Sequence, residues 1–265
     1  MNVPGLSIFF IVMNMLIGAA IPVILCIAFR KKWRCDFLPF WVGCGVMFLF
    51  AFVLEQIVHS VVLSTSAGSV IRNSLWLYAL YGGVMAGLFE ETGRLAAMKF
   101  LLKKKRGNDY NALMYGAGHG GFEAFYLLFF GMLNNLIYAV MLNSGSAELL
   151  MNGLDSANRA ILQSAFDTLA STSPFLFLAS PVERLAAVTA QLSLSVLVWF
   201  AAREGGKIGW YILAVLLHLL LDAVAVVMSG LGVPVVLIEL VIWVMAVLYA
   251  LLAAKVWKSE RAVRT

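Results

Sequence analysis

The stretch Glu90-Glu91-Thr92-Gly93-Arg94 decides how this chain is interpreted. It places three ionisable side chains within five residues, in the middle of an apolar segment that covers residues 75–102. A charge at the centre of a bilayer helix costs about 2.5–3.5 kcal/mol on insertion scales, so a charged group there is expected to have a function. Arg94 falls between Glu90 and Glu91 around a helix, so we expect one guanidinium to brace two carboxylates. An ion pair that only ties helices together is the simpler alternative.

The rest of the chain has the composition of a membrane protein. Of its 265 residues, 62% are hydrophobic and only 12% are charged, whereas about a quarter of the residues of a soluble domain are charged. The net charge of +5 does not indicate nucleic-acid binding, because Lys and Arg gather at the ends of apolar segments, where they orient a membrane protein. We therefore predict an all-α, multi-pass protein of the cell (plasma) membrane in which residues 1–265 form one domain.

Apolar segments long enough to cross the bilayer recur along the whole chain. A helix needs about 20 residues to cross a hydrocarbon core about 30 Å thick. About seven transmembrane helices are predicted, over residues 6–29, 37–63, 75–102, within 110–142, 181–202, 208–228 and 235–254.

The basic residues predict the orientation of these helices. With the N-terminus outside and the C-terminus inside, the cytoplasmic segments hold fourteen of the 19 Lys and Arg residues, whereas the outside loops hold only Arg72 and Arg159. The fourteen are Arg30, Lys31, Lys32, Arg34, Lys103, Lys104, Lys105, Arg106, Arg203, Lys207, Lys255, Lys258, Arg261 and Arg264.

One sizeable segment is predicted outside the membrane, residues 143–180. An approximate helical stripe suggests an amphipathic helix on the outer surface, acting as a lid; a packed loop is the alternative. The stripe consists of Leu154, Ala157, Ile161, Ala165, Thr168 and Leu169.

Two further segments pair a histidine with a carboxylate four residues later, which puts both on one helix face. These pairs are His119 with Glu123, in the glycine-rich stretch 116–123, and His218 with Asp222. We interpret the glycines as room for a substrate backbone near His119; a helix-packing patch is the alternative.

Counting from the cytoplasmic ends brings these residues to one depth. Glu90, His119 and His218 are 13, 12 and 11 positions from Lys103, Gly107 and Lys207 respectively. At 1.5 Å per residue the three lie within roughly 3 Å of one another in depth. This polar layer is the predicted active site.

Two other spans carry polar residues whose roles stay open at this point. Gln191 is 12 positions from Arg203, so it belongs to the polar layer and either donates to a reacting carbonyl or bonds a neighbouring helix. Glu55 and His59 are also four residues apart, but they are predicted near the outer edge of the membrane, in a separate polar cluster.

The three motifs, taken in order, resemble the YhfC family of intramembrane metalloproteases, which is similar to the PrsW proteases and the CAAX-type prenyl-protein proteases. The resemblance covers essentially the whole chain. It implies that Glu90 is the general base, that His119 positions the water, that His218 and Asp222 stabilise the oxyanion, and that Glu91 and Arg94 form a bracing pair. The second motif departs from both relatives: it has the form H-x-x-x-E, whereas PrsW-like chains have F-x-x-x-E and CAAX-type chains F-x-x-x-H. Whether His119 or Glu123 is the working residue therefore stays open.

The family name also raises the question of a metal. His119, His218 and Glu123 would suit Zn²⁺ with one position left for water. The motif H-E-x-x-H is absent from the sequence, so the ligands would have to come from different helices. A metal-free mechanism based on glutamate uses the same residues.

These observations predict an intramembrane endopeptidase that hydrolyses a peptide bond of a membrane-embedded or membrane-anchored substrate. A polar layer is what such chemistry requires, because water, base and oxyanion donor must be held together away from lipid. A proton- or ion-coupled transporter would also place carboxylates at mid-membrane depth. A non-catalytic immunity or scaffold protein that retained the motifs is the third interpretation.

Overall fold

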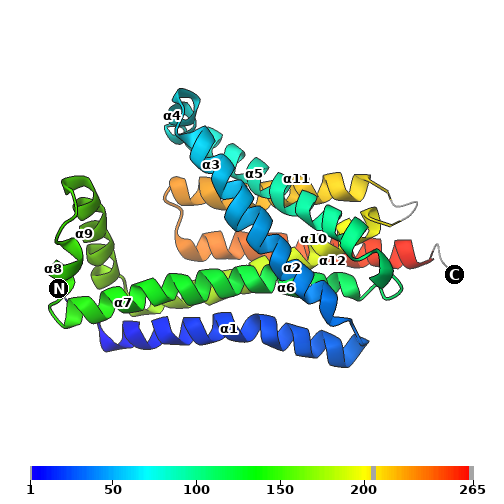
Figure 1. Ribbon diagram of the computed structural model, residues 1–265, viewed down its shortest axis with the longest axis horizontal. Helices are drawn as coiled ribbons and strands as arrows, with labels where there is room; N and C mark the ends of the chain where they lie inside the picture. Colours follow the sequence, from blue (N-terminus) through cyan, green and yellow to red (C-terminus); the bar gives the residue numbers. More distant parts are fainter. Residues whose placement is uncertain (1, 204–206, 263–265) are drawn as a thin grey trace. The chain divides into compact units, whose positions relative to one another are not determined.

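The computed structural model describes residues 2–203 and 207–262, and every regular element within them is a helix. Met1, 204–206 and 263–265 lie outside the described residues, and with them Arg264 of the predicted basic C-terminal end. The all-α prediction is confirmed. In chain order the elements are α1 Gly5–Trp33, α2 Phe37–Val46, η1 Met47–Glu55, α3 Gln56–Leu63, α4 Ser66–Arg72, α5 Leu75–Ala96, η2 Ala97–Leu101, η3 Lys103–Lys105, α6 Asn111–Phe125, η4 Tyr126–Phe130, α7 Gly131–Asn143, α8 Ala147–Met151, α9 Ser156–Ser171, η5 Pro174–Leu178, α10 Ala179–Ala201, α11 Gly209–Gly230 and α12 Val235–Ala262 (Figure 1).

Within the described residues, six helices are long and apolar enough to cross a membrane: Gly5–Trp33, Phe37–Leu63, Asn111–Asn143, Pro174–Ala201, Gly209–Gly230 and Val235–Ala262. They correspond to six of the seven predicted spans. The remaining one, over 75–102, forms as α5 followed by η2. It is not among the six, and it carries the three charges of the Glu90–Arg94 stretch. The protein is therefore a multi-pass membrane protein.

Large apolar side chains on the outer faces of these helices support this conclusion. Leu16, Trp41 and Phe100 are 67, 67 and 72% exposed, and many others are similarly open. A soluble protein rarely exposes so much contiguous apolar surface, whereas lipid covers such surface at no cost.

The described residues group into two compact units: 2–21 with 124–184, and 22–123 with 185–203 and 207–262. The boundary divides three helices: α1 between Ile21 and Pro22, α6 between Glu123 and Ala124, and α10 between Arg184 and Leu185. The organisation of 1–265 as one domain stays a prediction.

The first unit contains the segment predicted to lie outside the membrane. A helix forms there, α9, and its N-cap Asp155 accepts a hydrogen bond of 2.9 Å from the backbone N–H of Asn158. The predicted apolar stripe is wrong in part, because Ile161 is 69% exposed and the buried face is built around Phe166. The ring of Phe166 packs edge-on against Tyr138 with centroids 5.2 Å apart, so the largest side chain sets the face. The position of this segment relative to a membrane stays a prediction.

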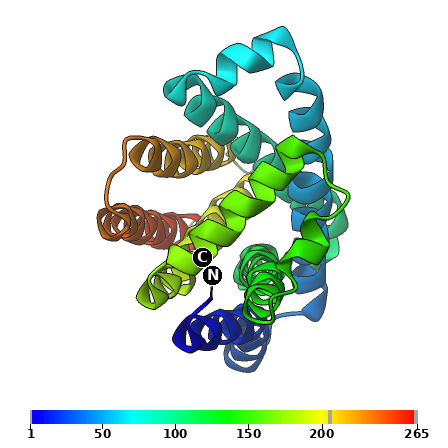
Figure 2. The same ribbon diagram turned by 90° about the vertical axis from the view of Figure 1, so that its left-hand side faces the viewer.

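The second unit is organised around α5, α10 and α11. Figures 1 and 2 show α11 and α12 side by side, and α5 packs along α11. That packing needs glycine: a Cβ at Gly87 would lie 2.8 Å from the carbonyl oxygen of Val215, so the two helix backbones approach closely. The C-terminal half of α10 is buried on all sides, including Trp199 and Phe200. A helix that is apolar all round belongs in the interior, and α10 is the central helix of this unit.

Candidate functional site

The polar residues singled out from the sequence gather in the second unit. Their set, called the polar cluster below, is supplied by α5, α6, α10 and α11 (Figure 1). It consists of Glu90, Glu91, Arg94, His119, Glu123, Gln191, His218 and Asp222.

Glu90 lies at the centre of the polar cluster. Its Oε2 is 2.9 Å from Nε2 of His119 and accepts a hydrogen bond of 3.0 Å from Nε2 of Gln191. Glu90 is 6% exposed and His119 is fully buried. The Nδ1 atom of His119 has no hydrogen-bond partner among the described residues. The predicted shared depth of Glu90 and His119 thus corresponds to direct contact.

Glu91 and Arg94 form a second, fully buried pair on the same helix. The Nη1 atom of Arg94 donates to both carboxylate oxygens of Glu91 at 2.8 Å, and its Nη2 donates to Oε1 of Gln191. The guanidinium therefore braces one carboxylate and not two, because Glu90 turns instead toward His119. This is the pair that the resemblance implied.

His218 connects the two carboxylates of α5. Its Nδ1 lies 2.8 Å from Oε1 of Glu91. Its Nε2 faces Oε1 of Glu90 at 3.9 Å and Oδ2 of Asp222 at 3.7 Å, which is beyond direct hydrogen-bond distance from both. A polar contact of that length is typically bridged by water or a ligand group.

Gln191 joins the two halves of the polar cluster, a role that the sequence left open. Its Oε1 accepts from Arg94, while its Nε2 donates to Glu90 and, at 3.1 Å, to Oε2 of Glu123. Glu123 is therefore tied to Glu90 through one amide. The depth count was the only sequence signal for Gln191.

The glycine-rich stretch before Glu123 packs helices together. A Cβ on Gly120 would lie 2.7 Å from Cβ of Gln191, and a Cβ on Gly118 would collide with the carbonyl of Phe40. The interpretation of these glycines as room for a substrate backbone is wrong. They let α6 approach α2 and α10 closely enough for His119 to reach Glu90.

Glu55 lies closer to the polar cluster than its sequence position indicated. It is 6% exposed, ends the π-helix η1, and interacts electrostatically with Glu90, His218 and Asp222. The α2–η1–α3 rod runs obliquely to α11 and α12 (Figure 1), so each of its residues gains less depth than in an upright helix. Counting residues therefore placed Glu55 too far out.

The predicted metal ligands do not come together. Zinc needs three or four ligand atoms around one point, at about 2.0–2.3 Å. No three His, Cys, Asp or Glu side chains within 2–203 and 207–262 are grouped in that way. Of the predicted ligands, His119 contacts Glu90 through Nε2, and Glu123 accepts from Gln191. These side chains are held by separate partners and do not converge on one point, so this arrangement does not fit a zinc centre.

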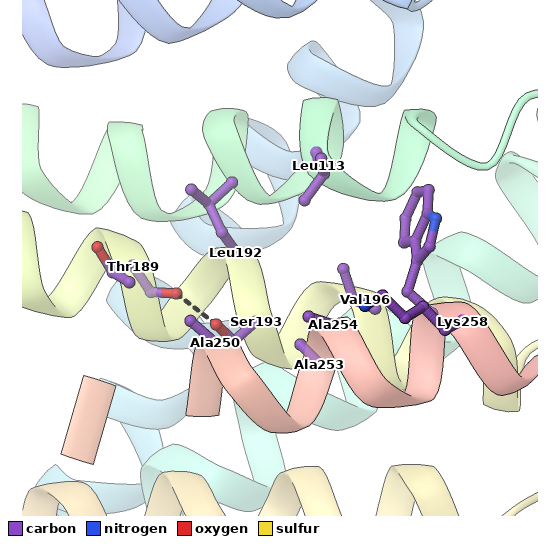
Figure 3. Close-up of a pocket in the computed structure, with 10 residues that line it drawn as sticks. Leu113, Thr189, Leu192, Ser193, Val196, Ala250, Ala253, Ala254 and Lys258 are labelled. Carbon is purple, nitrogen blue, oxygen red and sulfur yellow. Dashed lines mark hydrogen bonds between the residues drawn. The ribbon is translucent and has the colours of Figure 1, made fainter. Parts of the chain in front are cut away.

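A hollow of about 360 Å³ lies elsewhere in the second unit, between α6, α10 and α12 (Figure 3). Its walls are apolar apart from Lys258, Thr189 and Ser193, and the hydroxyl of Ser193 donates to the carbonyl of Thr189 at 2.7 Å. None of its lining residues belongs to the polar cluster. This hollow is therefore not lined by the groups around Glu90.

The fold and the polar cluster define a class of protein: a multi-pass helical membrane protein with acids, histidines and an arginine buried among its helices. The model of the family described as YhfC intramembrane metalloprotease matches residues 17–248, and this chain belongs to that family. It is 32% identical over 223 residues to the "Uncharacterized membrane protein YhfC" of Bacillus subtilis (strain 168), which covers 83% of this chain and 84% of that protein. No solved structure matches the chain. The predicted family is confirmed; its relation to the PrsW and CAAX-type proteases stays a prediction.

Proposed function

We propose that this protein is an intramembrane endopeptidase that hydrolyses a peptide bond of a membrane-embedded or membrane-anchored substrate, using water activated by Glu90. The observation that carries the proposal is the gap between Nε2 of His218 and the carboxylate oxygens of Glu90 and Asp222, at 3.9 and 3.7 Å. One water or one reacting carbonyl between them would meet a base and a hydrogen-bonding group at once. The family description supports peptide hydrolysis as the reaction class.

Glu90 is suited to be the base because one of its oxygens is held and the other is open. Oε2 is fixed by His119 and Gln191, while Oε1 faces His218 across the gap. A water beside Oε1 would give its proton to Glu90 as its oxygen attacks the carbonyl carbon of the substrate. Glu90 would then return the proton to the leaving nitrogen as the C–N bond breaks.

His218 is suited to the developing oxyanion. A carboxylate only accepts hydrogen bonds, so the contact of Nδ1 with Glu91 fixes the ring orientation and directs Nε2 into the gap. Asp222 lies on the other side of Nε2 and would orient the group bound there. Nε2 would donate to the oxyanion when the ring carries a proton on both nitrogens, a state that the carboxylates of Glu90, Glu91 and Asp222 around it favour. Oriented donors of this kind are among the largest contributions to acyl-transfer catalysis.

The test is hydrolysis by purified protein in lipid vesicles. Candidate membrane-anchored peptides are incubated in H₂¹⁸O, and mass spectrometry identifies a product whose new carboxyl group carries ¹⁸O. The Glu90→Gln variant keeps size and hydrogen bonding but removes the base, so we expect a loss of at least about 100-fold.

The matched control is Glu148→Gln, because Glu148 is an exposed carboxylate on α8, outside the unit that holds the polar cluster. This variant should keep the wild-type rate. Equal product from wild type and Glu90→Gln would refute the assignment of Glu90 as base. Substrate transport without cleavage would favour the transporter interpretation instead.

A further inference from the structure

A chain of three polar side chains leads from the N-terminal half of α5 toward the polar cluster. Nδ1 of His59 lies 2.9 Å from the hydroxyl of Tyr81, and Nε2 of His59 lies 3.1 Å from Oε1 of Glu55. Glu55 in turn interacts electrostatically with Glu90 and Asp222. Tyr81 lies on α5, His59 on α3 and Glu55 at the end of η1, from where it interacts with the cluster.

His59 and Tyr81, which are farther along the chain from the polar cluster, are more exposed than Glu55. The side chain of Glu55 is 8% exposed, that of His59 is 22% exposed, and Tyr81 is half-buried. Asp222, a member of the polar cluster itself, has a side-chain exposure of 38%. Glu55, His59 and Asp222 lie within apolar helices able to cross a membrane.

Exposed ionisable groups within a membrane-spanning helix are expected to face water and not lipid. A carboxylate in contact with hydrocarbon costs several kcal/mol, so such groups line a water-filled cavity or pair with one another. The side chain of Asp222 is open and the ring of His59 is partly open, so neither is sealed by its partner. The π-helix that ends at Glu55 is of a kind often found at functional sites, since it turns a side chain out of the regular helical register.

We propose that Tyr81, His59 and Glu55 line a hydrated path through which water reaches the polar cluster. The opposite face of the same span is a lipid surface: Ile57 and Val61, two residues after Glu55 and His59, are 56 and 62% exposed. The inference rests on the proposed function in one respect: that the water which reaches the polar cluster is a reactant there. The path itself follows from exposure and hydrogen bonding.

Cysteine accessibility tests the path without any need for activity. In a background with Cys26, Cys35 and Cys44 replaced by alanine, single cysteines are placed at 55, 59 and 81, and a small, positively charged methanethiosulfonate is added to sealed vesicles of either orientation. Matched cysteines at 57 and 61 control for depth.

We expect cysteines at 55, 59 and 81 to react at least about tenfold faster than those at 57 and 61, because a charged reagent enters lipid poorly. The faster reaction should come from one side of the membrane only. Rates at 55, 59 and 81 no faster than at 57 and 61 would overturn the path and leave the three residues as a dry contact between α3 and α5. Should Glu55→Cys fail to fold, Tyr81→Cys, at a half-buried position, against Val61→Cys decides alone.

The outcomes separate this inference from the proposed function. Fast labelling in a protein that hydrolyses nothing would uphold the path and refute the endopeptidase. Hydrolysis that requires Glu90, in a protein whose path residues resist labelling, would do the reverse.

Discussion

The buried pair of Glu91 and Arg94 gives the sharpest prediction about stability. Both side chains are fully buried, and the guanidinium makes two hydrogen bonds of 2.8 Å to the carboxylate. The variant Arg94→Met keeps a long side chain but leaves the charge of Glu91 without its partner. Removing one member of a buried ion pair costs about 3–5 kcal/mol, so we expect a loss of that size in the free energy of unfolding.

The assay is denaturant unfolding of purified protein in mixed micelles, followed by circular dichroism. A second variant, Glu91→Gln combined with Arg94→Met, removes both charges and should be about 2 kcal/mol more stable than Arg94→Met alone, because no uncompensated charge is left. Arg34→Met, at an exposed arginine, is the control and should change stability by less than about 0.5 kcal/mol. A cost below about 1 kcal/mol for Arg94→Met, or no recovery in the double variant, would refute the reasoning.

Two further predictions concern the metal and the topology. We expect purified wild-type protein to lack stoichiometric zinc and to keep its activity after chelation, because His119 contacts Glu90 directly; stoichiometric zinc that is lost in His218→Ala and kept in the control His59→Ala would contradict this. We also expect a reporter fused after Thr265 to be cytoplasmic and one inserted near Asn152 to be outside, because the basic residues cluster on the predicted inner side. The opposite labelling would overturn the orientation and the depth count together.

Much of the fold follows from the sequence because lipid imposes simple requirements. A helix that crosses the bilayer needs about 20 apolar residues, so the positions of the spans are visible in composition alone. The exception is instructive: the segment that contains Glu90 is a helix, α5, but it is not among the six helices that are apolar enough to cross a membrane. The feature that weakens its membrane signal is the feature that marks the site.

The depth count found the members of the polar cluster because helix rise is regular. It placed Glu90 and His119 together, and they are in contact at 2.9 Å. It misplaced Glu55, since residue counting does not capture the oblique course of α2–η1–α3 or the π-helical stretch within it. The role of the glycines was also beyond the sequence, because Gly118 and Gly120 have the same composition signal whether they face a helix or a substrate.

The orientation of Gln191 shows how the two halves of the polar cluster depend on each other. An amide has one acceptor and one donor end, and Arg94 has only donors, so Arg94 fixes Oε1 of Gln191 toward itself. The Nε2 end must then point away from Arg94, toward the carboxylates of Glu90 and Glu123. The bracing arginine therefore acts on the proposed base through one side chain that it orients. For that reason Gln191→Leu should remove one hydrogen-bond partner from Arg94 and also disturb the position of Glu90. Substitution of a residue that contacts neither Arg94 nor Glu90 should have neither effect.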